Sequence, residues 1–395
     1  MYENGASAAE LSFFRNRIEL FTIPRHNGGH EIERNEANDV TGKKIAAALS
    51  AAAVLGAAEV LRRPFWGGRA DREDRRSYAQ RADNFDGKFF VNPEEWALPG
   101  IGEDHPLSGK PQRPRHPLPG LRKKRSGSGD AVTWLGHSTL LLTMAGKNVL
   151  IDPIFSRHCA PVPLRGFLRY SRPPVRVEKL PPIDVVLLTH DHYDHLDYPT
   201  IRHLRDRVGC FVVPLGVEKH LLRWGVPPER IRALCWWEET QFDDLTVICT
   251  PCRHNSGRAT HRRTLCCSWV LRDGEHQVYE SGDTGWGGHF AAIHERYGDF
   301  DLAMLDCAQY DMAWHYSHMF PEESIMAAEA LCAAAAMPIH WGAFVLSKHA
   351  WDDPPERFVR AAESAGVLCV TPRLGERMTL GDWESYTRRW WRGME

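Results

Sequence analysis

The sequence lacks the cysteine patterns of a disulfide framework or a zinc finger. Its 10 cysteines include a single CxxC spacing, Cys249 and Cys252, without the second pair that a zinc finger needs, and a chain of 395 residues can bury a core without disulfide bonds. We therefore expect free thiols, most of them acting as small buried apolar side chains in a reducing compartment.

The sequence also lacks an excess of charge of either sign. Its 49 Lys and Arg residues nearly balance 51 Asp and Glu residues, which leaves a formal net charge of -2. This balance gives no global electrostatic case for a nucleic-acid partner. A hydrophobic fraction of 43% is normal for a globular protein. The partners that we expect are a substrate and no nucleic acid, and a homodimer is compatible with the sequence.

No apolar run is long enough to span a bilayer. The longest candidate, residues 45–58, follows Lys43 and Lys44 and has about 14 residues, whereas a spanning helix needs about 20. A positive flank before an apolar core is typical of a signal peptide or a signal anchor. The distance from Met1 favours a packed Ala-rich helix instead. Both interpretations stay open. The location, cytoplasmic or membrane-associated, and the true translation start therefore stay open as well.

Composition divides the chain into four parts. Residues 1–63 are predicted to be a poorly ordered or membrane-directed extension, and residues 64–130 an irregular lead-in that ends in a basic linker. Residues 131–380 alternate apolar runs with helical patterns and form the predicted catalytic domain. Residues 381–395 are a basic, aromatic tail, which suits either a lipid surface or simple packing.

Short apolar runs and helical patterns alternate in the catalytic part, which predicts a layered α/β architecture. The predicted strands are residues 132–134, 138–144, 149–151, 184–189, 211–214, 245–250, 265–271, 277–279, 302–305 and 338–339. The predicted helices are residues 200–207, 217–224, 288–297 and 321–336. The last of these has a good start, because Pro321 and two carboxylates occupy its first turn.

A cluster of metal-binding residue types directly follows the apolar run 184–189. It comprises His190, His192, Asp194 and His195. Two residues apart in extended chain, His190 and His192 project to the same side and can share one metal. A turn beyond them can aim Asp194 and His195 at a second metal. Imidazole and carboxylate ligands suit Zn²⁺, Mn²⁺ or Fe²⁺.

Further ligand candidates each follow a strand-like run. They are His254, Asp283 and His340. Each alone is weak evidence, but all three lie just after a strand, where the rigid sheet can position side chains of the following loop in a site. His261 is a nearby rival of His254 that lacks the position at a strand end.

These segments together resemble the metallo-β-lactamase superfamily, and more narrowly its branch of N-acyl phosphatidylethanolamine phospholipase D and bacterial relatives. The resemblance covers about residues 85–376 and rests on five stretches: WLGHST at 134–139, HDHYDHLD at 190–197, GDTG at 282–285, HMFPEE at 318–323 and IHWG at 339–342. It implies a four-layer αβ/βα sandwich with an N-terminal extension and a site at one edge of the two sheets.

The resemblance also implies the roles of the ligands. It assigns His190, His192 and His254 to a first zinc. It assigns Asp194, His195 and His340 to a second zinc, with Asp283 bridging the two. The sequence departs from the family at Asn255, where an aromatic residue is usual. This departure leaves the ligand in place but makes the adjoining pocket wall uncertain.

A water molecule shared by two metals would have its pKa lowered from ~15.7 towards ~7 and would act as the nucleophile. Asp194 and Asp283 would hold and orient it, and His318 is the candidate proton donor to the leaving oxygen. Gln309 and Tyr310 could line the substrate pocket. His137 and Asp152 are each read either as supports of a ligand or as structural residues.

The function that the branch resemblance implies is a phosphodiesterase acting on a phospholipid-like substrate, with peripheral membrane contact. A hydrolase of a small lactone, amide or ester could use the same metals. A non-catalytic, membrane-associated binding protein is the third hypothesis, and the complete ligand set argues against it. Fold and metals alone do not fix the substrate.

Overall fold

The computed structural model of the chain describes residues 63–100, 113–118, 120, 129–161, 165–258 and 260–394. The predictions for residues 1–62, including the apolar run 45–58, and for the basic linker 121–128 lie outside the described residues. The chain from Gly67 onward forms one compact unit.

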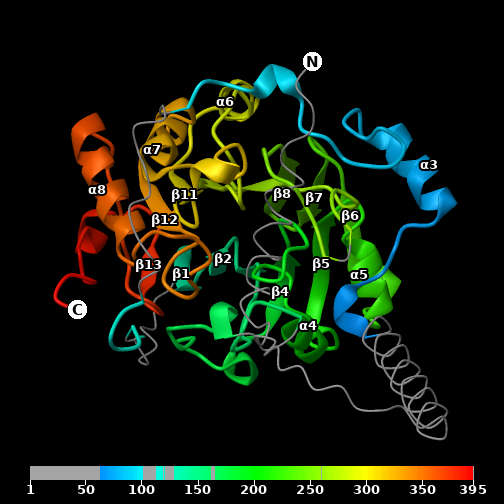
Figure 1. Cartoon of the computed structure of the whole chain (residues 1–395), viewed down its shortest axis with the longest axis horizontal. Helices are drawn as coiled ribbons and strands as arrows, with labels where there is room; N and C mark the ends of the chain where they lie inside the picture. Colours follow the sequence, from blue (N-terminus) through cyan, green and yellow to red (C-terminus); the bar gives the residue numbers. More distant parts are fainter. Residues whose placement is uncertain are drawn as a thin grey trace, which may run out of the picture. The chain divides into compact units, whose positions relative to one another are not determined.

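Two β-sheets form the framework of this unit (Figure 1). The seven-stranded sheet has the order β13 (Arg377–Thr379), β1 (Ala131–Gly136), β2 (Thr139–Met144), β3 (Lys147–Ile151), β4 (Ile183–Leu187), β5 (Val208–Pro214), β6 (Ile231–Leu234). The six-stranded sheet has the order β12 (Ala336–Ile339), β11 (Leu302–Asp306), β10 (Gln277–Glu280), β9 (Ser268–Arg272), β8 (Leu245–Thr250), β7 (Glu239–Phe242). Each sheet contains both parallel and antiparallel pairs.

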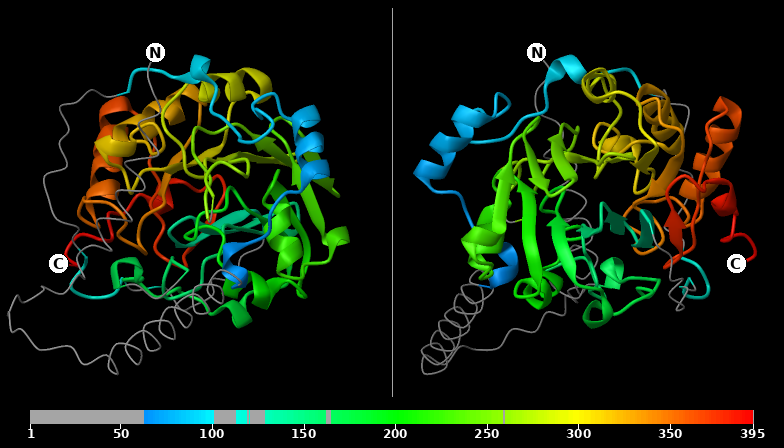
Figure 2. Two further views of the ribbon diagram at one scale, coloured as in Figure 1. Left: turned by 45° about the vertical axis from the view of Figure 1, so that its right-hand side comes forward. Right: turned by 180° about the vertical axis from the view of Figure 1, so that it is seen from behind.

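Helices cover the outer faces of the two sheets (Figures 1 and 2). They are α4 (Tyr198–Leu204), α5 (Glu218–Arg223), α6 (His289–Tyr297), α7 (Pro321–Ala330) and α8 (Asp353–Ala365). Helix α3 (Arg72–Arg81) instead packs beside the ends of β5 and β6, in a small cluster with Leu215 and Cys235. The first sheet packs against α4 and α5, whereas α7 contacts β11 and α8 contacts β12 of the second. In the part of the chain that the structure describes, each helix is too short or too polar to cross a bilayer.

Strand β4 shows why the sequence forms four layers. Val185 and Leu187 lie in the apolar core that is shared with strands of the second sheet. Val186 and the following Leu188 instead pack with residues of α4 and α5. Because both faces of the strand are buried, its sequence is a continuous apolar run. The predicted αβ/βα sandwich is therefore confirmed.

Helix α7 begins at Pro321 as predicted, and the Glu323 carboxylate accepts a hydrogen bond from the Phe320 backbone N–H at 2.9 Å. The predicted end at Ala336 is wrong, because the helix stops at Ala330 and Ala336 already belongs to β12. The alanine run carries no local stop signal. Its end is set by tertiary contacts, including the hydrogen bond from the Ala334 N–H to the Phe300 carbonyl.

The segment that precedes the sheets contains a helix that sequence patterns did not indicate. Helix α3 begins with a capping box in which Asp71 and Asp74 accept from each other's backbone N–H groups. Tyr78 of this helix packs with Phe85, Phe90 and Leu265 in a small core of its own. The lead-in therefore packs on the same compact unit as the sheets.

The basic, aromatic tail also packs against the fold. Trp391 is buried, and its indole N–H donates to Glu356 of α8 at 2.7 Å. Arg392 pairs with the same carboxylate at 2.6 Å, and the Trp390 ring stacks on Trp341 with centroids 5.7 Å apart. These contacts favour the interpretation that the tail packs against the fold over the interpretation that it forms a lipid-binding surface.

Candidate metal centre

The loop after β4 carries four of the predicted ligands. The chain leaves the sheet at Leu187, and a turn closed by the Leu196 N–H bonding to the His192 carbonyl at 2.9 Å follows. This turn allows His190 and His192 to face one position and Asp194 and His195 to face another. The structure thus places the cluster at the carboxyl end of a parallel strand, where ligand sites commonly form.

The first group of ligand atoms comprises His190, His192, His254 and Asp283. The Nδ1 atom of His192 lies 3.0 Å from Nε2 of His190 and 3.1 Å from Nε2 of His254. The Asp283 Oδ2 atom lies 3.6 and 3.8 Å from the same two Nε2 atoms. Three imidazoles and a carboxylate therefore converge on one point, as a cation site requires.

The second group comprises His137, Asp194, His195 and His340. Asp194 Oδ2 lies 3.6 Å from Nε2 of His195 and 2.8 Å from Nε2 of His137. His340 reaches the group from the loop after β12. All members except His137 are the ligands that the resemblance assigned to a second metal.

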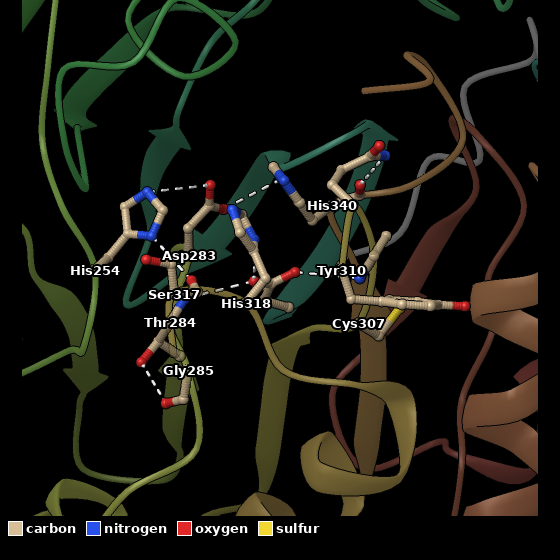
Figure 3. A network of polar contacts seen from close by, with 12 residues as sticks. His254, Asp283, Thr284, Gly285, Cys307, Tyr310, Ser317, His318 and His340 are labelled. Atoms are coloured by element: carbon tan, nitrogen blue, oxygen red, sulfur yellow. Dashed lines mark hydrogen bonds and ion pairs between the residues drawn. The ribbon is translucent and has the colours of Figure 1, made fainter. Parts of the chain in front are cut away.

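Asp283 lies between the two groups. Its Oδ2 atom is 3.1 Å from His195 Nε2, and its Oδ1 atom is 3.2 Å from His340 Nδ1. His254 and His340 approach its carboxylate from opposite sides (Figure 3). Gly282 before it has φ of +54°, and a Cβ there would lie 2.9 Å from the Thr189 Cβ atom. Only glycine allows the chain to bring Asp283 this close to the β4 loop.

The arrangement of these atoms fits bound cations. His195 Nε2 and Asp283 Oδ1 are buried and make no hydrogen bond among the described residues. These two atoms thus approach neighbouring ligand atoms without a hydrogen bond, which is the geometry of ligands that face a common ion. Two carboxylates and five imidazoles form a donor set suited to two divalent first-row metals.

The pKa shifts of most of the ligands favour the same conclusion. His195 is the exception, because burial lowers its pKa but Asp283, Asp194 and Asp152 raise it more, to well above the ordinary value. Burial lowers the pKa values of His190, His254 and His340 well below the ordinary value for histidine. Burial raises the pKa of Asp283, but the adjacent His195 and His340 lower it more, so that it lies well below the usual range. Neutral imidazoles and ionised carboxylates are the forms that bind metals.

One further side chain and one backbone carbonyl hold ligands in position. Asp152 accepts from His195 Nδ1 at 2.7 Å and from the Thr189 backbone N–H at 2.8 Å. The Ser317 carbonyl accepts from His254 Nδ1 at 2.9 Å. Such contacts fix the tautomer and the ring orientation of a ligand. Asp152 therefore takes the supporting role that the sequence left open.

His318 lies beside the metal groups, as predicted for the proton donor. Its Nδ1 atom is 3.0 Å from Oδ2 of the buried Asp306, and its ring stacks on His340 with centroids 5.3 Å apart. Burial lowers the pKa of His318, but Asp306 raises it more, to about 9. The sequence did not indicate Asp306 as a functional residue. Its position at the end of a strand gives no sign that it contacts His318, which lies 12 residues further along the chain.

Gln309 and Tyr310 are both buried, and their polar atoms serve the fold. The Gln309 amide nitrogen donates to the carbonyls of His340 and Phe344, at 3.2 Å each. The Tyr310 hydroxyl donates to Asp353. Their predicted role in substrate binding stays a prediction, and these contacts give it no support. His261 is exposed and joins none of the groups found among the described residues, unlike His254.

Comparisons with known proteins agree with this geometry. Residues 147–341 match a family model described as a β-lactamase superfamily domain. An uncharacterized protein of Mycobacterium tuberculosis is 42% identical over 278 residues, which are 67% of this chain and 74% of that protein.

Two other similarities concern a named enzyme and a solved structure. The N-acyl-phosphatidylethanolamine-hydrolyzing phospholipase D 1 of Caenorhabditis elegans is 31% identical over 234 residues, 55% of this chain and 65% of that enzyme. The crystal structure of a possible metal-dependent hydrolase from Veillonella parvula covers 64% of this chain and 100% of its own, with a TM-score of 0.52 and 16% identity. At this identity, the second similarity shows the fold alone.

Proposed function

Because the chain belongs to the metallo-β-lactamase superfamily of metal-dependent hydrolases, we propose that it is a binuclear zinc phosphodiesterase acting on a phospholipid-like substrate. The observation that carries this proposal is the position of Asp283, whose carboxylate belongs to the first group of ligand atoms and lies 3.1 and 3.2 Å from His195 and His340 of the second. The relative that is named as a phospholipase D supports the choice of substrate.

Two zinc ions bound here would supply a nucleophile from water at neutral pH and would stabilise negative charge in the transition state. The protein residues complete the reaction. With Nδ1 held by Asp306, the Nε2 atom of His318 is the ring nitrogen left to protonate the leaving oxygen. Its pKa of about 9 keeps it protonated at neutral pH. Water thus adds to phosphorus, the phosphorus–oxygen bond breaks, and the products are a phosphomonoester and an alcohol.

The leaving group provides a test of this assignment. We expect His318→Gln to lower kcat for an N-acyl-phosphatidylethanolamine in vesicles by about 10²-fold, the contribution of one general acid. Hydrolysis of bis-p-nitrophenyl phosphate should fall far less, because p-nitrophenolate leaves without protonation. An equal loss on both substrates would contradict the role as a general acid.

The same assays test the substrate class. Wild-type protein should cleave both phosphodiesters, and activity on vesicles requires the peripheral membrane contact that we propose with the lipid substrate. Metal-loaded protein that cleaves neither phosphodiester but opens a lactone, or hydrolyses an amide or ester, would replace the phosphodiesterase by the alternative hydrolase.

A further inference from the structure

The turn that joins β1 to β2 lies beside the second group of ligands. The backbone of His137 is fixed there by three hydrogen bonds. Its N–H donates to the Trp341 carbonyl at 2.8 Å, and its own carbonyl accepts from the His340 N–H at 3.2 Å and from the Trp134 indole at 2.7 Å. The turn is therefore tied directly to the loop that carries the ligand His340.

The side chain of His137 is fully buried and reaches the ligand Asp194. Its Nε2 atom lies 2.8 Å from Asp194 Oδ2. Within the described ranges, no other hydrogen bond to the Asp194 carboxylate is found. His137 thus makes the contact that fixes the orientation of this carboxylate, which lies in a turn and not in a strand.

Other ligands have a comparable partner. His195 is held by Asp152 and His254 by the Ser317 carbonyl. Ser138, the neighbour of His137, lies with its hydroxyl 3.0 Å from Nδ1 of His340. The side chains of two consecutive residues of one turn therefore hydrogen-bond to two ligands of the second group, His137 to Asp194 and Ser138 to His340.

The backbone of His137 indicates that this position is under constraint. Its φ of +55° lies in the left-handed region, which non-glycine residues rarely adopt and which asparagine adopts more readily than histidine. A residue in such a conformation persists because its surroundings hold it there, and such positions cluster at functional sites.

We propose that His137 is a positioning residue that fixes the Asp194 carboxylate for the second metal. This inference rests on the proposed metal-dependent function and extends it to a residue that supports a ligand. It predicts a selective effect. Loss of the contact between His137 and Asp194 lowers the affinity for the second metal and leaves the binding of the first metal unchanged.

The test compares zinc binding by full-length wild type, His137→Asn and His137→Gln. Each protein is stripped by a chelator and titrated with Zn²⁺ against a chromophoric competitor. His137→Asn shortens the side chain beyond reach of Asp194 but suits the backbone, so we expect a folded protein without metal, with a melting temperature lowered by the lost buried contact. Its second zinc should bind about 10–100-fold more weakly, as is usual when a supporting partner of a ligand is lost. His137→Gln keeps a donor at similar reach and should bind the second zinc more tightly than the asparagine variant.

The exposed His203→Asn on α4 is the control and should bind two zinc ions as wild type does. A folded His137→Asn protein that binds both ions with wild-type affinity would overturn the inference and leave the proposed function intact. A wild type that binds no zinc would instead contradict the proposed function. If His137→Asn does not fold, His137→Gln decides, because loss of the first zinc together with the second would overturn the selective role.

Discussion

Replacing Asp283 by asparagine is expected to lower activity on bis-p-nitrophenyl phosphate by about 10³-fold or more. A metal centre supplies several kcal/mol of charge stabilisation in the transition state, and each ~1.4 kcal/mol corresponds to a factor of ten. Asparagine preserves the volume of the side chain but removes its charge. It also places an amide nitrogen, which is no ligand, among the imidazoles of His195 and His340, which lie 3.1 and 3.2 Å from the present carboxylate.

Metal content should fall with activity, because Asp283 belongs to the first group of ligand atoms and its carboxylate also lies 3.1 and 3.2 Å from His195 and His340 of the second group. The matched control is Asp206→Asn, which removes an exposed carboxylate 3.2 Å from Arg205 on the surface. It should keep wild-type metal content and activity. A folded Asp283→Asn protein with two metals and undiminished turnover would refute the central position of this carboxylate.

Asp152→Asn is expected to lower the affinity for the second metal by about 10–100-fold, with little loss of folding stability. One amide oxygen can still accept the Thr189 N–H, and asparagine tolerates the φ of +40° at this position. The amide nitrogen, however, would donate to His195 Nδ1 where the carboxylate now accepts. The imidazole proton then moves to Nε2, the atom that faces Asp283, and the ring can no longer bind a cation there.

Asp152→Ala should have the same effect on the metal and an additional effect on the fold. It leaves the N–H of Thr189 and Nδ1 of His195 buried without an acceptor. Each lost partner lowers the free energy of unfolding by about 1–3 kcal/mol. Urea unfolding in the presence of a chelator measures this loss separately from metal binding. If both variants were equally destabilised and both kept the second metal, the supporting role of Asp152 would be wrong.

The grouping of the candidate ligands could be predicted from sequence because each segment that carries them follows a strand. His190, His254 and Asp283 come after short apolar runs, and strand ends converge at one edge of a sandwich. The supporting residues could not be assigned in this way. Asp152 is 43 residues from His195, and His137 is 57 residues from Asp194, so that only the folded chain shows the pairs.

The fold was predicted best where both faces of a strand are buried. Strand β8 has the predicted bounds Leu245–Thr250, whereas β6 and β7 were missed because their exposed polar residues interrupt the apolar pattern. Helix α8 was missed because Pro354 and Pro355 suggest a turn. Proline is allowed in the first turn of a helix, where its missing N–H would have no partner.

The most direct test of the account is the metal content of the purified full-length protein after reconstitution with zinc, measured by elemental analysis beside Asp194→Ala. The account predicts two zinc ions per wild-type chain and a lower content in the variant, in which the second group loses its carboxylate. A wild-type protein that is folded yet binds no zinc after reconstitution would contradict the two-metal centre and the hydrolase built on it.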